Sequence, residues 1–176
     1  MKNSGKWIFL LSFTVGILGC SQKSTSSFKP DSEPDGFAGI KWNTPFSEVK
    51  SDMAESRSIS DPAEPNVKIK IYYTKKGDPL ELGGAKLDKI EYVFWRGKFA
   101  EARISATGAE NFDRLSKFLF EKYGTVNKSQ GAYFWDGRVT QIFLKYDEAS
   151  KSLLLTIAST SIASQEVKDI FDKDKD

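Results

Sequence analysis

Apolar and polar side chains alternate one by one in several stretches of the chain. From residue 67 to 73, and again from 90 to 95, an apolar side chain occupies every second position. A period of two is typical of a β-strand with one buried face. Turn signals such as Arg96-Gly97 and Asp136-Gly137 indicate antiparallel hairpins. Further strands are predicted at residues 99–106, 132–135, 138–146 and 152–159.

One long stretch has the period of a helix instead. Thr107 and Glu110 match a capping box at its start, and Gly124 suits a helix stop at its end. The apolar residues between these ends lie three or four positions apart, as one face of a helix requires. They are Phe112, Leu115, Leu119 and Tyr123.

A shorter helix is predicted at residues 45–55. Thr44 is a suitable N-cap, and Pro45 suits the first helical position. Its apolar face would consist of Phe46, Val49 and Met53. We therefore predict an α+β fold with an antiparallel sheet of about six strands and two helices. The order of elements also suggests a tandem repeat of one helix–three-strand unit.

The first residues have the layout of an export signal. Lys2 and Lys6 precede an apolar run from residue 7 to 18, which ends at Gly19 and Cys20. The run has about a dozen residues, fewer than the ~20 that a transmembrane helix needs. Residues 1–19 are therefore predicted to be a cleaved signal peptide.

The residues before Cys20 resemble the lipobox of bacterial lipoproteins. In Ile17-Leu18-Gly19-Cys20 an aliphatic, a variable and a small residue precede the cysteine. The resemblance implies cleavage before Cys20 and attachment of lipid to its sulfur, which anchors the chain in a membrane. Ser21 is not the aspartate that retains enterobacterial lipoproteins in the inner membrane. If the cell has two membranes, the resemblance therefore favours the outer one.

The mature chain is expected to begin with a lipidated cysteine and a disordered tether at residues 20–36. This segment is rich in Ser, Pro and charge, which disfavours order. Residues 37–160 would form one domain, and residues 161–176 a short helix and a charged tail. Without Lys2 and Lys6 the 26 basic residues fall to 24, equal to the 24 acidic ones. A neutral chain gives no support for binding to nucleic acid.

The order of elements is similar to that of small α+β lipoproteins of the outer-membrane assembly type. It is also similar to that of two-repeat inhibitor proteins that bind β-lactamases. In both groups a helix near the start of a unit packs on an antiparallel sheet. The segment GIKWNTP at residues 39–45 also resembles a segment of uncharacterised bacterial lipoproteins. These resemblances imply an envelope setting and no particular chemistry.

No motif specifies a catalytic site. Histidine, the usual base beside a nucleophile, is absent. Ser47 and Lys50 fit the S-x-x-K pattern of penicillin-binding enzymes, but so do Ser26 and Lys29 in the expected tether. The companion motifs S-D-N and K-T-G do not occur. Carboxylates that could hydrolyse cell-wall sugars include Glu91, Glu101, Asp136 and Asp147.

No cofactor is expected. The chain has one cysteine and no histidine, which excludes an internal disulfide and histidine-ligated metals. Gly83-Gly84 precedes a predicted strand, so it indicates a turn and not a phosphate-binding loop. Three alternating aspartates near the C-terminus lack the glycine and glutamate of a calcium loop and are interpreted as a charged tail. They are Asp172, Asp174 and Asp176.

Several aromatic residues are adjacent in the predicted strands. Neighbours in a strand point to opposite faces, so one member of each pair would lie on the open face if helices cover only the other. For the pair Phe134-Trp135 the exposed side could be Phe134, or Trp135 together with Tyr133. The candidate binding surface, for an envelope protein or a glycan, is Tyr72, Trp95, Tyr133 and Trp135.

Three hypotheses for the function follow. The first is a lipid-anchored envelope protein with a non-catalytic binding or assembly role, which would tolerate alanine at Trp95 and Trp135 without loss of folding. The second is a wall-directed hydrolase that uses carboxylates or the Ser47–Lys50 pair. The third is a structural spacer without a specific ligand.

Overall fold

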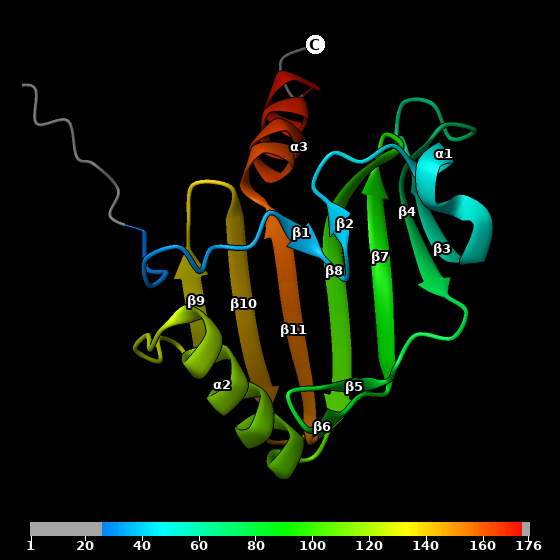
Figure 1. Ribbon diagram of the computed structural model, residues 1–176. Coiled ribbons are helices and arrows are strands. Elements are labelled where there is room, and N and C mark those ends of the chain that lie inside the picture. Colours follow the sequence, from blue (N-terminus) through cyan, green and yellow to red (C-terminus); the bar gives the residue numbers. More distant parts are fainter. Residues whose placement is uncertain (1–25, 174–176) are drawn as a thin grey trace, which may run out of the picture.

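A seven-stranded antiparallel sheet forms the centre of the protein (Figure 1). The computed structural model describes residues 26–173, so the predicted signal peptide, the lipobox and Cys20 lie outside the described part. The strands follow one another across the sheet in the order β3-β4-β7-β8-β11-β10-β9. They span Met53–Ser60 (β3), Lys68–Lys75 (β4), Lys89–Trp95 (β7), Lys98–Thr107 (β8), Ser152–Ser159 (β11), Thr140–Asp147 (β10) and Ala132–Asp136 (β9).

Each half of the sheet runs in sequence order from an edge to the centre. The first half ends with β8 and the second with β11, and these two strands pair antiparallel in the middle. The first half holds four strands and the second three. The additional strand of the first half is β3, which was not predicted. The α+β fold with its antiparallel sheet is confirmed, and the second half matches the predicted unit of one helix and three strands.

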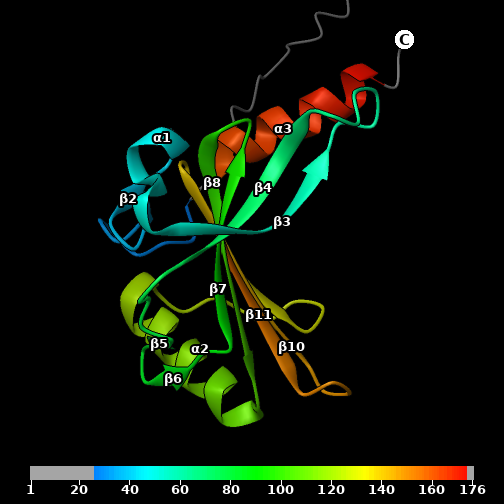
Figure 2. The ribbon, with the colours of Figure 1, turned by 90° about the vertical axis from the view of Figure 1, so that its right-hand side faces the viewer.

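Two layers flank the sheet (Figure 2). On one side lie α1 (Phe46–Val49), α2 (Ala109–Tyr123) and two small hairpins. The hairpins are β1–β2 (Gly36–Phe37 with Ile40–Lys41) and β5–β6 (Glu81–Leu82 with Ala85–Lys86). On the other side lies α3 (Thr160–Lys173), which follows β11 directly. We call the side that carries α3 the open face, because most of it has no helix on it.

One hydrophobic core lies between the sheet and α2. It extends along the chain from Phe28 to Ile157 and includes the buried face of α2, with Leu115 and Leu119 fully inaccessible. A smaller cluster joins Ile162 of α3 to the open face. A chain that begins at residue 21 contains this whole core and is therefore expected to fold on its own.

The first predicted helix is wrong over most of its length. Only α1 is α-helical, a 3-10 turn follows at Lys50–Asp52, and β3 begins at Met53. The apolar positions Phe46, Val49 and Met53 do pack against the core, as predicted. A short helix and a 3-10 turn, followed by an edge strand, thus bring these three apolar residues to the core without the long helix that was predicted.

The second predicted helix is confirmed, but its capping box is wrong. Thr107 lies in β8, and its hydroxyl donates to Asp88 rather than to the start of α2. Gly108 occupies the N-cap position without a side-chain hydrogen bond. At the other end Gly124 has a φ of 99° and its N–H donates to the carbonyl of Phe120, so the predicted stop is correct.

Residues 26–35 do not form the predicted disordered tether. We call them the strap, because they run over β9 and the end of α2 (Figure 1). The Ser27 N–H donates to the carbonyl of Asp136 at 2.9 Å, and the Lys29 N–H donates to that of Tyr123 at 2.8 Å. Phe28 is buried with its ring edge-on to Tyr123. One buried aromatic ring and backbone hydrogen bonds therefore order a segment whose composition is typical of disorder.

Candidate functional site

A cavity of about 380 Å³ lies on the side of the sheet that carries α2. Its walls come from the strap and β1, from the β5–β6 hairpin, from α2 and from the sheet. This volume is within the usual range of small-molecule sites. Most of the lining is apolar and includes Phe37, Leu82, Ile90, Phe118, Leu119 and Ile157.

Asp78 and Tyr92 form a polar spot in the wall of this cavity. The Tyr92 hydroxyl donates to Oδ1 of Asp78 at 3.1 Å. Burial, together with the negative charge and hydrogen bond of Asp78, raises the pKa of Tyr92 far above its usual value, so its hydroxyl keeps its proton. The Oδ2 atom of Asp78 is buried and has no hydrogen-bond partner among the described residues. Asp78 and Tyr92 thus give the mostly apolar cavity a polar spot on its sheet side.

A cation lies at the side of the cavity formed by α2. Lys122 lines the cavity, and its Nζ is 5.5 Å from the ring centre of Phe118 and 5.3 Å from that of Tyr123. Such a position over aromatic faces is favourable for an ammonium group. Glu81 also lines the cavity and is exposed to solvent.

Gly83 lets the β5–β6 hairpin approach α2. Gly83 and Gly84 form the two-residue turn between the strands, both at positive φ, so the predicted turn is confirmed. A Cβ on Gly83 would lie 2.4 Å from Cβ of Phe118. The hairpin therefore reaches the helix only because residue 83 has no side chain.

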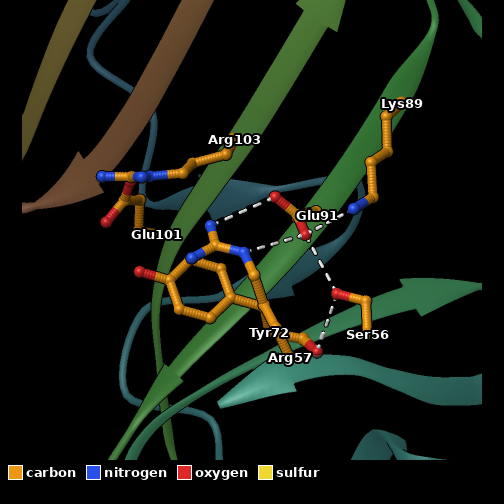
Figure 3. A network of polar contacts seen from close by, with 7 residues as sticks. All are labelled: Ser56, Arg57, Tyr72, Lys89, Glu91, Glu101 and Arg103. Atoms are coloured by element: carbon orange, nitrogen blue, oxygen red, sulfur yellow. Dashed lines mark hydrogen bonds and ion pairs between the residues drawn. The ribbon is translucent and has the colours of Figure 1, made fainter. Parts of the chain in front are cut away.

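A second polar arrangement lies on the open face (Figure 3). We call Arg57, Lys89, Glu91, Glu101 and Arg103 the ion cluster. Glu91 accepts hydrogen bonds from Arg57, Lys89 and the Ser56 hydroxyl, with the Lys89 contact at 2.7 Å. Glu101 accepts from Arg103. The cluster links β3, β7 and β8 across the sheet.

The two carboxylates of this cluster are engaged in ion pairs. Burial acts to raise the pKa of Glu91, but hydrogen bonds from Lys89, Arg57 and Ser56 outweigh it and hold that pKa below its usual value. A general acid requires the opposite shift. The cluster therefore has the character of a cross-strand support rather than of an acid–base pair.

The candidate aromatic surface is wrong, because its rings are covered. Tyr72 lies on the open face, but the Arg57 guanidinium sits 3.3 Å from its ring centre. Trp95 packs against Ala100 and Ile162 of α3. Trp135 is fully buried on the core side and donates its indole N–H to the carbonyl of Gly124.

Tyr133 is also on the core side, where its ring lies 5.0 Å from that of Phe120 of α2. Phe134 therefore points to the open face, and 45% of it is exposed. Its cross-strand partner is Phe143. Of the two alternatives for this pair, Phe134 is therefore the exposed one, and an apolar patch exists on the open face there rather than at Tyr72, Trp95, Tyr133 and Trp135.

The other candidate residues do not form sites in the described part. Ser47 and Lys50 are exposed on α1 and the turn after it, and Ser26 and Lys29 belong to the strap. Asp136 accepts from Gln141, and Asp147 from Ser150, both on the surface. Asp172 is at the end of α3, whereas Asp174 and Asp176 lie outside the described residues.

Within residues 26–173 no group of three or more metal-ligating side chains comes together. None of the helices there is both long enough and apolar enough to cross a membrane.

Sequence patterns did not indicate the cavity, because its lining comes from segments far apart in the chain. Leu82 and Phe118, for example, lie in a two-residue strand and in a helix. The one local signal was Gly83-Gly84, which predicted the turn but not what it packs against. Comparisons of the chain with family models, with curated proteins and with solved structures give no significant match.

Proposed function

We propose that this chain is a lipid-anchored, non-catalytic binding protein of the bacterial envelope. Its cavity takes the apolar part of a small amphiphilic molecule. The observation that carries this proposal is the apolar cavity of about 380 Å³ with one polar spot at Asp78 and Tyr92. A binding site of this kind gains affinity from apolar surface and orientation from a few polar groups.

The composition of the cavity wall favours an amphiphile over a sugar. Sugar rings carry many hydroxyl groups, and each needs a partner when it is buried. This wall offers few such partners, since apolar residues such as Ile90, Ile157 and Leu119 form much of its sheet and helix sides. The polar spot formed by Asp78 and Tyr92 suits a single polar head group.

The carboxylates also favour binding over hydrolysis. Asp78 and Glu81 both line the cavity, but Glu81 is exposed on the two-residue strand β5. Glu91 and Glu101 are paired with cations on the opposite side of the sheet. The residues that line the cavity therefore support a binding role better than they support hydrolysis.

The test uses N-phenyl-1-naphthylamine, an uncharged probe that fluoresces in apolar surroundings, and a chain of residues 21–176. We expect saturable binding to the wild type and none to Leu82→Trp, because the larger ring fills the cavity. The matched control is Leu80→Trp, since Leu80 is half exposed in the same connection. It should bind the probe normally.

Both variants should keep a cooperative thermal transition, which shows that they fold. Binding that is equally tight to Leu82→Trp would place the probe elsewhere and contradict the proposal. No saturable binding to the wild type would contradict it as well.

A further inference from the structure

Three apolar side chains from neighbouring strands share the open face. Phe134 of β9 is directly opposite Phe143 of β10, and Phe143 is opposite Thr156 of β11. Leu154 is two residues from Thr156 in the same strand and so points to the same side. We call Phe134, Phe143 and Leu154 the β9–β11 patch.

The β9–β11 patch is accessible in the described structure. Phe134 is 45% exposed and Leu154 37%, and Phe143 is partly exposed. Val139, in the turn between β9 and β10, adds a further exposed apolar side chain at 47%. The core-side residues of these strands, such as Trp135 and Leu155, are fully buried. Strands whose inner face already fills the core thus also carry exposed apolar side chains on the open face, with polar neighbours such as Lys145, the cross-strand partner of Leu154.

The strap brings the anchor of the chain to this same corner. Ser27 exchanges hydrogen bonds with the backbone of Asp136, two residues from Phe134 in β9. Two residues of a strand span only about 7 Å. From Ser26 back to Cys20 there are six residue steps, which reach at most about 22 Å even when fully extended.

We propose that the β9–β11 patch docks on the lipid bilayer that holds the Cys20 anchor. The proposal rests on the lipid attachment in the proposed function and not on the cavity. The short connection keeps this edge of the sheet close to the bilayer, where exposed aromatic and aliphatic side chains find an apolar partner. Phe and Leu on a membrane-facing surface are typical of interfacial binding.

The same geometry places the cavity relative to the bilayer. The strap residues Ser32 and Pro34 form part of the cavity wall, and they directly continue the segment that leads to the anchor. The cavity itself lies on the α2 side of the sheet, opposite the β9–β11 patch, so it faces away from a bilayer on which the patch docks.

The experiment uses the full lipidated chain in vesicles of phosphatidylethanolamine and phosphatidylglycerol. A nitrobenzoxadiazole label is placed on Phe134→Cys, where the introduced thiol is the one free cysteine once Cys20 is acylated. The matched control is Ile59→Cys, because Ile59 has the same exposure of 45% but lies in β3 at the opposite edge of the sheet.

Brominated acyl chains in the vesicles should quench the label at position 134 and leave that at position 59 unchanged. Adding Leu154→Glu puts a charge into the patch and should abolish the quenching at position 134. The exposed control substitution Leu80→Glu should not abolish it.

Three results would overturn the proposal. Equal quenching at both positions would show that neither edge of the sheet is preferred. A label at position 134 that is shielded in cell envelopes but not in pure lipid vesicles would assign the patch to a protein partner. If mass spectrometry finds no lipid on Cys20, the chain has no lipid anchor there and this inference is wrong. Binding of the fluorescent probe in the cavity does not depend on that result.

Discussion

Trp135 and Phe134 are neighbours in β9 with opposite surroundings. Trp135 is fully buried beside Phe120, and its indole N–H donates to the carbonyl of Gly124 at 2.7 Å. Phe134 is 45% exposed on the open face. The hypothesis that alanine at Trp135 leaves folding intact therefore does not hold for this structure.

We expect Trp135→Ala to lower the free energy of unfolding by about 3–5 kcal/mol, as other large core aromatics do. The loss includes a cavity in the core and a carbonyl at Gly124 without its partner. Phe134→Ala should change stability by less than about 1 kcal/mol, because the site is on the surface. Urea denaturation of residues 21–176 measures both. Similar values for the two variants would contradict the assigned faces.

Alternation in the sequence located such pairs but not the side that is covered. Phe134-Trp135 was correctly expected to split between two faces, and the adjacent Tyr72 and Tyr73 split in the same way. Tyr72 and Trp95 on the open face are nevertheless buried, because Arg57 covers Tyr72 and α3 covers Trp95, and these contacts come from other parts of the chain. Local periodicity contains no such information, so the predicted surface was wrong.

At the scale of elements, the sequence predicted six strands of the main sheet well and missed the edge strand β3. All six predicted strands and α2 are present within a few residues of their expected ends. The strand β3 was missed because its sequence, MAESRSIS, is polar and its side chains are mostly exposed. An edge strand needs little apolar surface, since its hydrogen bonds to β4 hold it in place.

The strap is the clearest case in which tertiary contacts override composition. Glu33 accepts hydrogen bonds from the backbone N–H groups of Val139 and Thr140 at 2.7 and 3.0 Å. Thr140 in turn accepts from the indole of Trp42. Polar residues that are typical of a tether thus serve as partners for the turn between β9 and β10.

We predict that Glu33→Ala speeds hydrogen exchange at the Val139 and Thr140 amides by about ten-fold, the effect of losing one charge-assisted hydrogen bond. The amide of Lys29 should be protected in the wild type, whereas in a disordered tether it would exchange freely. Asp35→Ala is the control, because the ion pair of Asp35 with Lys41 is exposed and contributes little. Rapid exchange of the Lys29 amide in the wild type would contradict an ordered strap and support the disordered tether predicted from the sequence.

At the scale of the whole molecule, the two sides of the sheet are held together differently. The α2 side is an apolar core, whereas the open face near β3 is held by the ion cluster. Glu91 joins Arg57 of edge strand β3 to central strand β7. Its side chain is only 11% exposed, so solvent screens these contacts weakly. The ion cluster therefore contributes to global stability in a way that depends on pH.

The sign of that dependence follows from the lowered pKa of Glu91. A carboxyl group whose pKa is lower in the folded state than its ordinary value of 4.5 stabilises the fold above that value. This contribution is lost as the pH falls through the folded-state pKa. We expect Glu91→Gln to lower the free energy of unfolding by about 1–3 kcal/mol at pH 7. The difference from the wild type should shrink steadily below pH 4.5, where Glu91 itself becomes neutral.

Urea denaturation of wild type and Glu91→Gln between pH 7 and the acid limit of folding measures this difference. Glu148→Gln is the control, because Glu148 is 81% exposed in its pair with Lys151 and should change stability little at neutral pH. A difference between wild type and Glu91→Gln that stays constant with pH would show that the charge of Glu91 does not stabilise the fold. In that case β3 would be held by its backbone hydrogen bonds to β4 and by the stacking of Arg57 on Tyr72, which an arginine retains at every pH of the titration.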